Sequence, residues 1–182
     1  APAAARRFKP GQFYRLQNYE TQARRLKDTS LLMEGIALTG AWVDPDRGLL
    51  SLIALELGVS SRLCRYLQPG ERVVVMGPTG TPTEIEANEN VLLAGGGLGN
   101  AVLFSIAEAL KEKNKRVIYF AGYRKMGDLF KRREIEKACD LVVWSVDEGD
   151  KIEARRPQDR SFRGNIVQAM ESYARGELGE IL

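Results

Sequence analysis

A glycine-rich turn between an apolar run and an amphipathic stretch constrains the fold of this 182-residue chain more than any other feature. Residues 91–94 are apolar, which predicts a buried parallel strand. Residues 101–113 carry apolar side chains on one helical face, which predicts a helix. A strand, a glycine turn and a helix in this order direct backbone N–H groups and the positive end of the helix toward an anion such as phosphate. The turn consists of Gly95, Gly96, Gly97, Leu98, Gly99 and Asn100.

The glycine turn also has a plainer interpretation. Its spacing departs from G-x-G-x-x-G because position 100 is Asn, and glycines between a strand and a helix can serve packing alone. Without a Cβ, however, the backbone turns tightly and lets a pyrophosphate approach closely. We therefore predict that Gly97 and Gly99 lie against a pyrophosphate and that Gly99 has a backbone conformation that favours glycine. The amide of Asn100 is a further candidate to reach the ligand.

Composition excludes several classes of function. The net charge of +3 is too small to indicate binding to nucleic acid or to an anionic membrane. No apolar run approaches the roughly 20 residues of a membrane span. The sequence contains no histidine, which removes the commonest general base and the Ser-His and Cys-His nucleophile systems. A cofactor is therefore expected to carry any chemistry.

The two cysteines and the first residues bear on the setting of the protein. Cys64 and Cys139 lie far apart without metal-ligand spacing, which favours free, buried thiols in a reducing, cytoplasmic compartment. Residues 1–7 lack both an initiator Met and the apolar core of a signal peptide. We therefore expect the chain to be a fragment of a longer polypeptide.

Short strand-like segments dominate the first part of the chain. They predict a small antiparallel β-barrel in a first domain over residues 1–84. The charged residues 17–33 favour a solvated loop or hairpin. Residues 62–67 predict a short helix, and residues 77–80 predict a turn. The predicted strands are 12–16, 34–43, 49–57 and 71–76.

After the polar segment 81–90, strands and helices alternate. This rhythm predicts an α/β domain over residues 85–182 with a parallel sheet, in which three strands are recognisable. Asp128 is expected to cap the second helix, and residues 147–163 are polar and charged with no predicted strand. The predicted strands are 91–94, 116–121 and 141–146, and the predicted helices are 101–113, 129–139 and 165–175.

Six short segments occur in an order typical of one known family. They are 9–13, 58–63, 67–80, 94–101, 119–124 and 145–149, and their patterns resemble PGQF, G-x-x-S, L-x-P-G-D to G-P-x-G, A-G-G-x-G-x-A, Y-G-x-R and T-D-D-G. Over most of its length the chain therefore resembles the ferredoxin–NADP reductase superfamily. Within it, the chain is most similar to NAD(P)H-linked electron-transfer subunits of the dihydroorotate dehydrogenase, sulfide dehydrogenase and glutamate-synthase-associated types.

The resemblance implies an oxidoreductase module that takes hydride from NADH or NADPH and passes electrons through FAD or FMN to a partner domain or subunit. It places the nicotinamide cofactor on the glycine turn. Asp147 and Glu148 would accept hydrogen bonds from the adenosine ribose of NAD, or form only a charged turn. Arg124 would instead contact the 2′-phosphate of NADP.

The resemblance also implies a flavin site in the first domain, at Ser60, Ser61 and Arg62. Helix capping by the serines, with a surface arginine, is the alternative interpretation. The family usually carries R-P-x-S on a barrel strand, where the arginine pairs with the flavin phosphate. Glu34 takes the place of that arginine and Ala37 that of the serine.

These departures change the expected function. A carboxylate repels a phosphate where the family attracts it, so we expect this chain to retain flavin weakly or not at all. The alternative function is a nucleotide-binding or subunit-docking module that has lost flavin and has no activity of its own. The opening strands of the barrel and a later strand with a C-G-P motif are also absent, which predicts unpaired sheet edges.

Overall fold

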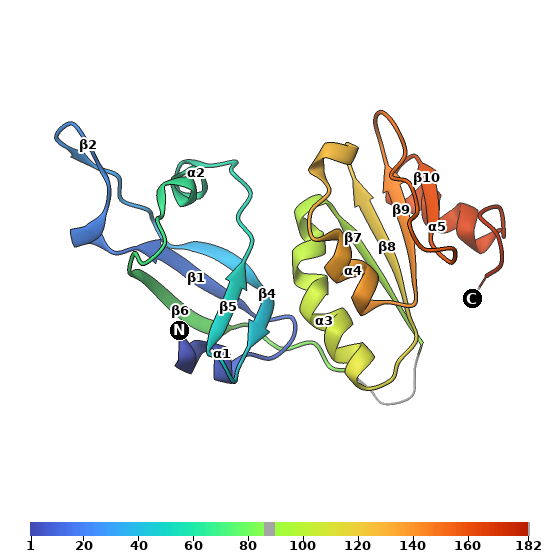
Figure 1. Cartoon of the computed structure of the whole chain (residues 1–182), viewed down its shortest axis with the longest axis horizontal. Helices are drawn as coiled ribbons and strands as arrows, with labels where there is room; N and C mark the ends of the chain where they lie inside the picture. Colours follow the sequence, from blue (N-terminus) through green and yellow to red (C-terminus); the bar gives the residue numbers. More distant parts are fainter. Residues whose placement is uncertain (86–89, 182) are drawn as a thin grey trace. The chain divides into compact units, whose positions relative to one another are not determined.

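An antiparallel sheet forms the first of two units in the chain. The computed structural model describes residues 1–85 and 90–181, and the chain divides into the units Ala1–Thr83 and Glu84–Leu182 (Figure 1). Residues 86–89, part of the polar segment expected between the domains, lie outside the described residues. The first sheet has the order β5-β4-β1-β6, and its neighbouring strands are antiparallel, which confirms the antiparallel sheet expected of a barrel that lacks its opening strands. Its strands are β1 (Phe13–Asn18), β4 (Ile36–Asp44), β5 (Leu49–Leu52) and β6 (Val73–Thr79).

A short helix that the sequence did not predict bridges the two edge strands of this sheet. Helix α1 (Pro2–Arg7) contacts β4, β5 and β6. The Tyr14 hydroxyl donates a hydrogen bond to the Ala4 carbonyl at 3.0 Å. The Phe8 ring stacks on the Tyr14 ring, with the two ring centroids 5.9 Å apart. Burial raises the pKa of Tyr14 to about 12, so this hydroxyl remains a donor at neutral pH.

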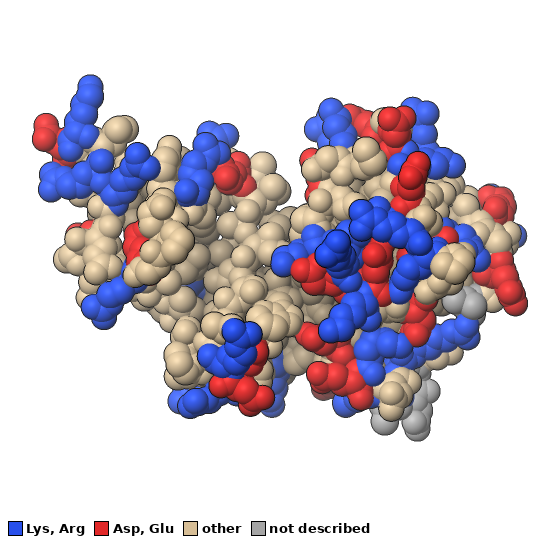
Figure 2. All heavy atoms as spheres, in the orientation of Figure 1, with Lys and Arg blue, Asp and Glu red and all other residues tan. Residues whose placement is uncertain are grey.

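An exposed hairpin projects from the first sheet. Strands β2 (Arg25–Leu26) and β3 (Thr29–Ser30) pair with each other, and Figure 2 shows Lys and Arg side chains gathered at this hairpin. A 3₁₀ turn, η1 (Glu20–Gln22), precedes them. At the base, the buried Asn18 donates through Nδ2 to the Leu31 carbonyl at 2.7 Å and accepts from the Met33 N–H at 2.9 Å. A two-stranded hairpin is marginal by itself, so this clamp fixes the hairpin to the sheet.

Three predictions in the first unit are wrong in detail. The strand predicted over 49–57 ends at Leu52. The helix begins earlier than expected, as α2 (Val59–Leu63) followed by the 3₁₀ turn η2 (Cys64–Tyr66), because Ser61 Oγ accepts the Gly58 N–H and so caps it. The predicted turn over 77–80 is mostly strand, because β6 continues and Thr79 pairs with Phe13 of β1.

The second unit is a parallel sheet between two helical layers. Its strand order is β10-β9-β8-β7, and every neighbouring pair is parallel. Helices α3 and α4 contact each other and the sheet, whereas α5 contacts β7, β8 and β9. The strands are β7 (Val91–Gly96), β8 (Val117–Tyr123), β9 (Leu141–Val146) and β10 (Arg160–Arg163). The helices are α3 (Asn100–Glu112), α4 (Arg132–Ala138) and α5 (Ile166–Ala174), with 3₁₀ turns η3 (Gly97–Gly99) and η4 (Met126–Asp128).

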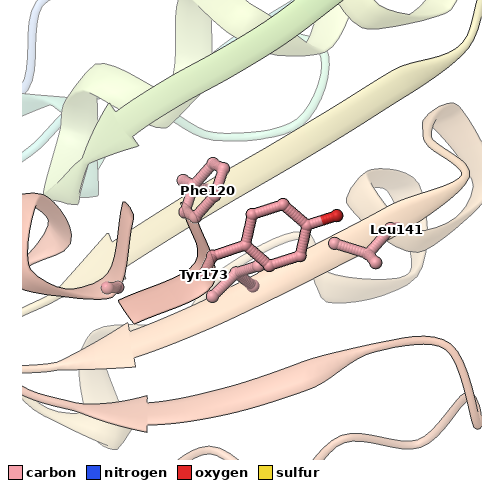
Figure 3. Packing of buried hydrophobic residues seen from close by; sticks show 5 residues of the cluster. Phe120, Leu141 and Tyr173 are labelled. Carbon is pink, nitrogen blue, oxygen red and sulfur yellow. The ribbon is translucent and has the colours of Figure 1, made fainter. Parts of the chain in front are cut away.

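The sides of this sheet follow from the alternation of side chains along β8. Tyr119 reaches Asn100 of α3, whereas Phe120 packs against α5. The Phe120 ring meets Tyr173 edge to face, with centroids 5.5 Å apart, and Leu141 lies in the same cluster (Figure 3). Each fully buried side chain of this size contributes about 1.5–3 kcal/mol to folding.

The fourth strand, β10, and the start of α4 correct the sequence analysis. Strand β10 lies in the polar segment where no strand was predicted, and it pairs with β9 from Arg160↔Val143 onward. Helix α4 begins at Arg132 behind Lys131, whose φ is +55°, and not behind Asp128. Asp128 instead closes η4 by accepting the Lys125 N–H at 3.1 Å.

A buried ion pair holds the polar segment onto the sheet. The Asp159 side chain is fully buried, and Arg156 donates to both of its carboxylate oxygens, from Nε at 2.9 Å and from Nη2 at 2.7 Å. Asp159 Oδ1 also accepts the Val142 N–H at 2.9 Å. Arg156 further donates to the Cys139 carbonyl at 3.0 Å. These bonds join the approach to β10 to β9 and to the end of α4.

Three further observations concern the described residues. Both cysteines are free thiols, Cys139 buried and Cys64 half-buried. Within 1–85 and 90–181, no cluster of His, Cys, Asp or Glu is suited to hold a metal ion. None of the helices in these ranges combines the length and apolarity that crossing a bilayer requires.

Candidate functional site

The carboxyl ends of β7, β8 and β9 meet at one edge of the second sheet. In the register of the ladders, Gly96 lies beside Gly122, Gly122 beside Ser145, and Tyr123 beside Val146. The glycine turn, Arg124 and the acidic pair therefore leave the sheet at the same edge, although they are far apart in the sequence. Ligands of open parallel sheets bind outside this edge.

The glycine turn presents open backbone. Gly96 ends β7, the next three residues form one 3₁₀ turn, and α3 begins at Asn100. A Cβ built on Gly96, Gly97 or Gly99 would meet no atom within 4 Å. The helical run begins with η3, and the first N–H groups of such a run have no acceptor within it. Those of the glycine turn are therefore available to an anion in this open space, whereas the Asn100 N–H already donates to the Gly97 carbonyl.

The glycines differ in what they require. Gly97 has φ +51°, which favours glycine, but Gly99 has φ −57°, which any residue adopts, so the expected strain at Gly99 is wrong. Gly95 has no room for a side chain, because a Cβ there would lie 2.6 Å from Asn100 Oδ1 and 2.8 Å from Leu103 Cδ1. Gly95 therefore allows α3 to pack closely against β7, Gly97 allows the backbone to bend, and Gly99 leaves open space in front of the turn.

Asn100 points into the protein. It is fully buried, and its Nδ2 donates to the Gly97 carbonyl at 2.9 Å and to the Gly122 carbonyl at 3.4 Å. Its Oδ1 accepts from the Tyr119 hydroxyl at 3.1 Å. The polar atoms of this amide are thus used by the turn and by β8, and Tyr119 is a member of the site that the sequence analysis missed. A tyrosine in an apolar strand gives no sequence signal beyond that of a core residue.

Charged side chains form a second cluster where β8 and β9 end. Arg124 Nε lies 3.0 Å from Glu148 Oε1, and Lys125 Nζ lies 3.6 Å from Glu148 Oε2. The hydrogen bond from Arg124 lowers the pKa of Glu148, so this carboxylate stays ionised. The Asp147 side chain is exposed and has no hydrogen bond or ion pair with any residue in the described ranges.

Two buried polar groups lie close to this edge. Within the described part of the chain, the Tyr123 hydroxyl and Ser145 Oγ have no hydrogen-bond partner. Burial raises the pKa of Tyr123, which keeps its hydroxyl protonated. Neither residue was identified from the sequence, because both fall within apolar strands.

The residues predicted for flavin lie together in the first unit. Ser60 Oγ accepts the Glu34 N–H at 3.1 Å, so the structure brings the acidic substitution directly to the start of α2. Ser61 Oγ accepts from the Gly58 N–H at 2.9 Å and from the Leu57 N–H at 3.1 Å. Both hydroxyls therefore already cap or bridge backbone. Arg62 is exposed.

Comparison with known proteins identifies the family. The chain is 31% identical over 176 residues to the homolog of the dihydroorotate dehydrogenase B (NAD(+)) electron transfer subunit from Thermotoga maritima, covering 96% of this chain and 55% of that protein. It also matches a solved structure of an NADH-dependent reduced ferredoxin–NADP oxidoreductase, studied for flavin-based electron bifurcation, with TM-score 0.78 and 26% identity over 96% of this chain and 56% of the other. The chain belongs to the ferredoxin–NADP reductase superfamily.

This member of the ferredoxin–NADP reductase superfamily spans about half the length of each of these two relatives. An uncharacterized protein of Rickettsia prowazekii is 43% identical over 123 residues, which cover 68% of this chain and 16% of that protein. No protein-family model matches the chain.

Proposed function

We propose that this chain is an oxidoreductase module that binds a nicotinamide nucleotide at the carboxyl edge of its parallel sheet. The observation that carries the proposal is the open backbone at Gly96, Gly97 and Gly99 in front of α3, where no atom fills the space of a side chain. Free N–H groups and the positive end of the helix suit a pyrophosphate. A bound nicotinamide would supply hydride, and the chain's own residues would hold and orient the nucleotide.

The charges beside the turn favour NADH over NADPH. Arg124 and Lys125 are the cations that would bind a 2′-phosphate, and both already form ion pairs with Glu148. Asp147 has a free carboxylate that suits ribose hydroxyls as an acceptor and repels a phosphate. The name of one relative, an NAD(+) electron transfer subunit, agrees with this preference.

The electron acceptor is a flavin or a partner electron carrier. The Glu34 carboxylate at the start of α2 does not suit a flavin phosphate, and no step of the proposal depends on a flavin held by this chain. The same observation favours a second candidate function, a nucleotide-binding or docking module without flavin, whose partner domain or subunit performs the redox chemistry.

Replacing Gly99 by Val is expected to weaken NADH binding at least tenfold, or about 1.4 kcal/mol. The new side chain enters the space assigned to the pyrophosphate, and neither a clash nor a forbidden φ accompanies it. Calorimetric titration of the wild type and the variant with NADH and NADPH measures both affinity and preference. Gly127→Val is the matched control, because Gly127 also lies in a 3₁₀ turn with nothing within 4 Å.

The two variants separate the functional interpretation from the packing interpretation. If the wild type binds NADH and the folded Gly99→Val variant binds it equally well, the turn serves packing alone. Circular dichroism shows whether each variant is folded.

We expect the purified protein to carry no stoichiometric flavin, as measured by its visible absorption spectrum. Glu34→Arg should raise flavin retention, because an attractive charge replaces a repulsive one at the start of α2. Glu20→Arg makes the same charge change elsewhere in the first unit and should leave retention unchanged. Stoichiometric FAD or FMN in the wild type would show that Glu34 does not occupy the place of the family arginine.

A further inference from the structure

We propose that Asn100 is a positioning residue that holds the glycine turn so that the Leu98 N–H points outward, toward the diphosphate of a bound nucleotide. This inference rests on the proposed nucleotide binding at the turn and adds a residue whose side chain acts without touching the ligand. The observation that supports it is that the buried Asn100 amide donates to the Gly97 carbonyl, directly behind the exposed backbone of the glycine turn.

The contacts of Asn100 fix one peptide plane. Its side-chain Nδ2 and its backbone N–H both donate to the Gly97 carbonyl. In a trans peptide the C=O and the following N–H point in opposite directions. Because the Gly97 oxygen is held inward, the N–H of Leu98 in the same peptide group faces outward, into the open space beside Gly96 and Gly99.

Tyr119 determines which way the Asn100 amide is oriented. The Tyr119 hydroxyl lies 3.1 Å from Oδ1 and 3.3 Å from the Asn100 carbonyl oxygen, and it is a donor because burial raises its pKa. Oδ1 therefore faces Tyr119, and Nδ2 faces the two carbonyl oxygens. The flipped amide would set Oδ1 against the carbonyls of Gly97 and Gly122 with no proton between them.

The same amide ties the turn to the neighbouring strand. The bond to the Gly122 carbonyl joins the start of α3 to the end of β8, two residues before Arg124. The missing Cβ of Gly95 leaves the room that Oδ1 occupies, since a Cβ there would lie 2.6 Å away. Asn100 thus sets the turn relative to β8, one of the three strands whose carboxyl ends form the candidate site.

Calorimetry with NADH on the full chain tests the inference. Asn100→Leu keeps the size of the side chain but removes its hydrogen bonds, and it should weaken NADH binding at least tenfold. Ser105→Ala is the control, because it removes a buried side-chain bond to the Val102 carbonyl further along α3 and should leave the affinity unchanged. Circular dichroism establishes that both variants are folded.

A spectroscopic signature separates positioning from a general loss of structure. In ¹⁵N-labelled wild type, NADH should shift the Leu98 amide proton strongly, as expected of a new charge-assisted hydrogen bond. In folded Asn100→Leu that shift should be lost. Tyr119→Phe should give an intermediate loss of affinity, and adding it to Asn100→Leu should cost little more, because the two residues act through one network.

The outcomes are distinct. A wild type that binds neither NADH nor NADPH refutes the proposed function itself. A wild type that binds NADH, together with folded Asn100→Leu of equal affinity and equal Leu98 shift, overturns the positioning role alone. If Asn100→Leu fails to fold, Tyr119→Phe decides: unchanged affinity and an unchanged Leu98 shift in that variant overturn the inference.

Discussion

Replacing Asp159 by Ala is expected to lower the free energy of unfolding of the second unit by about 4 kcal/mol. The wild-type carboxylate is fully buried, with Arg156 on both oxygens and the Val142 N–H on one of them. The substitution leaves a largely buried guanidinium without its counter-charge and a strand N–H without an acceptor. The attachment of the segment that leads into β10 is lost at the same time.

The two tryptophans make the measurement specific to one unit. Trp42 lies in β4 and Trp144 in β9, so in a Trp42→Phe background the fluorescence reports on the second unit during urea denaturation. Glu177→Ala is the control, because it removes an exposed partner of Arg175 at 3.9 Å and should change stability by no more than about 0.5 kcal/mol. Equal effects of the two substitutions would contradict the assigned role of Asp159.

Replacing Gly95 by Val is expected to destabilise the second unit by about 3 kcal/mol and to abolish NADH binding. The added Cβ would lie 2.6 Å from Asn100 Oδ1 and 3.1 Å from Asn100 Cα, so the start of α3 has to move. A backbone atom is among the obstacles, and side-chain rotation alone therefore cannot relieve the clash. The displaced turn no longer presents its N–H groups in one direction.

The neighbouring glycine provides the comparison for this prediction. Gly96 has φ −107° and ψ 130°, an extended conformation that suits valine, and open space around its Cβ position. Gly96→Val should therefore keep the stability of the wild type within about 0.5 kcal/mol while it weakens NADH binding. Urea denaturation and NADH titration of both variants distinguish the two roles, and equal stability of both variants would refute the packing role of Gly95.

Periodicity predicts those parts of the fold whose local pattern agrees with their packing. Strand β7 and helix α3 were predicted to within two residues, because residues 91–94 form a continuous apolar run and the apolar side chains of α3 repeat with the period of a helix. Strand β10 was missed, because Arg160–Arg163 has a single apolar side chain, Phe162, and an ion pair from outside the strand secures its approach. The start of α4 was missed because Asp128 closes its own turn.

The sequence predicts the position of the candidate site but not the contacts between its side chains. Strand ends in a parallel sheet share one edge, so the assembly of the glycine turn, Arg124 and Asp147 there follows from the strand prediction. Which carboxylate pairs with Arg124, and which way the Asn100 amide faces, depend on side-chain geometry that spacing does not encode. Identical glycines likewise differ in role, because φ and free space come from the tertiary structure.

The strand order of the second sheet, β7, β8, β9, β10, follows the order of the chain, and this has a consequence for how the protein folds. Each strand pairs with the one before it, so the sheet can grow by closing one crossover at a time, each at a modest cost in loop entropy. In the first unit β1 pairs with β6, and almost the whole unit lies between them. Contacts between distant segments form slowly, so we expect the β1–β6 ladder to be the late step of folding in the first unit.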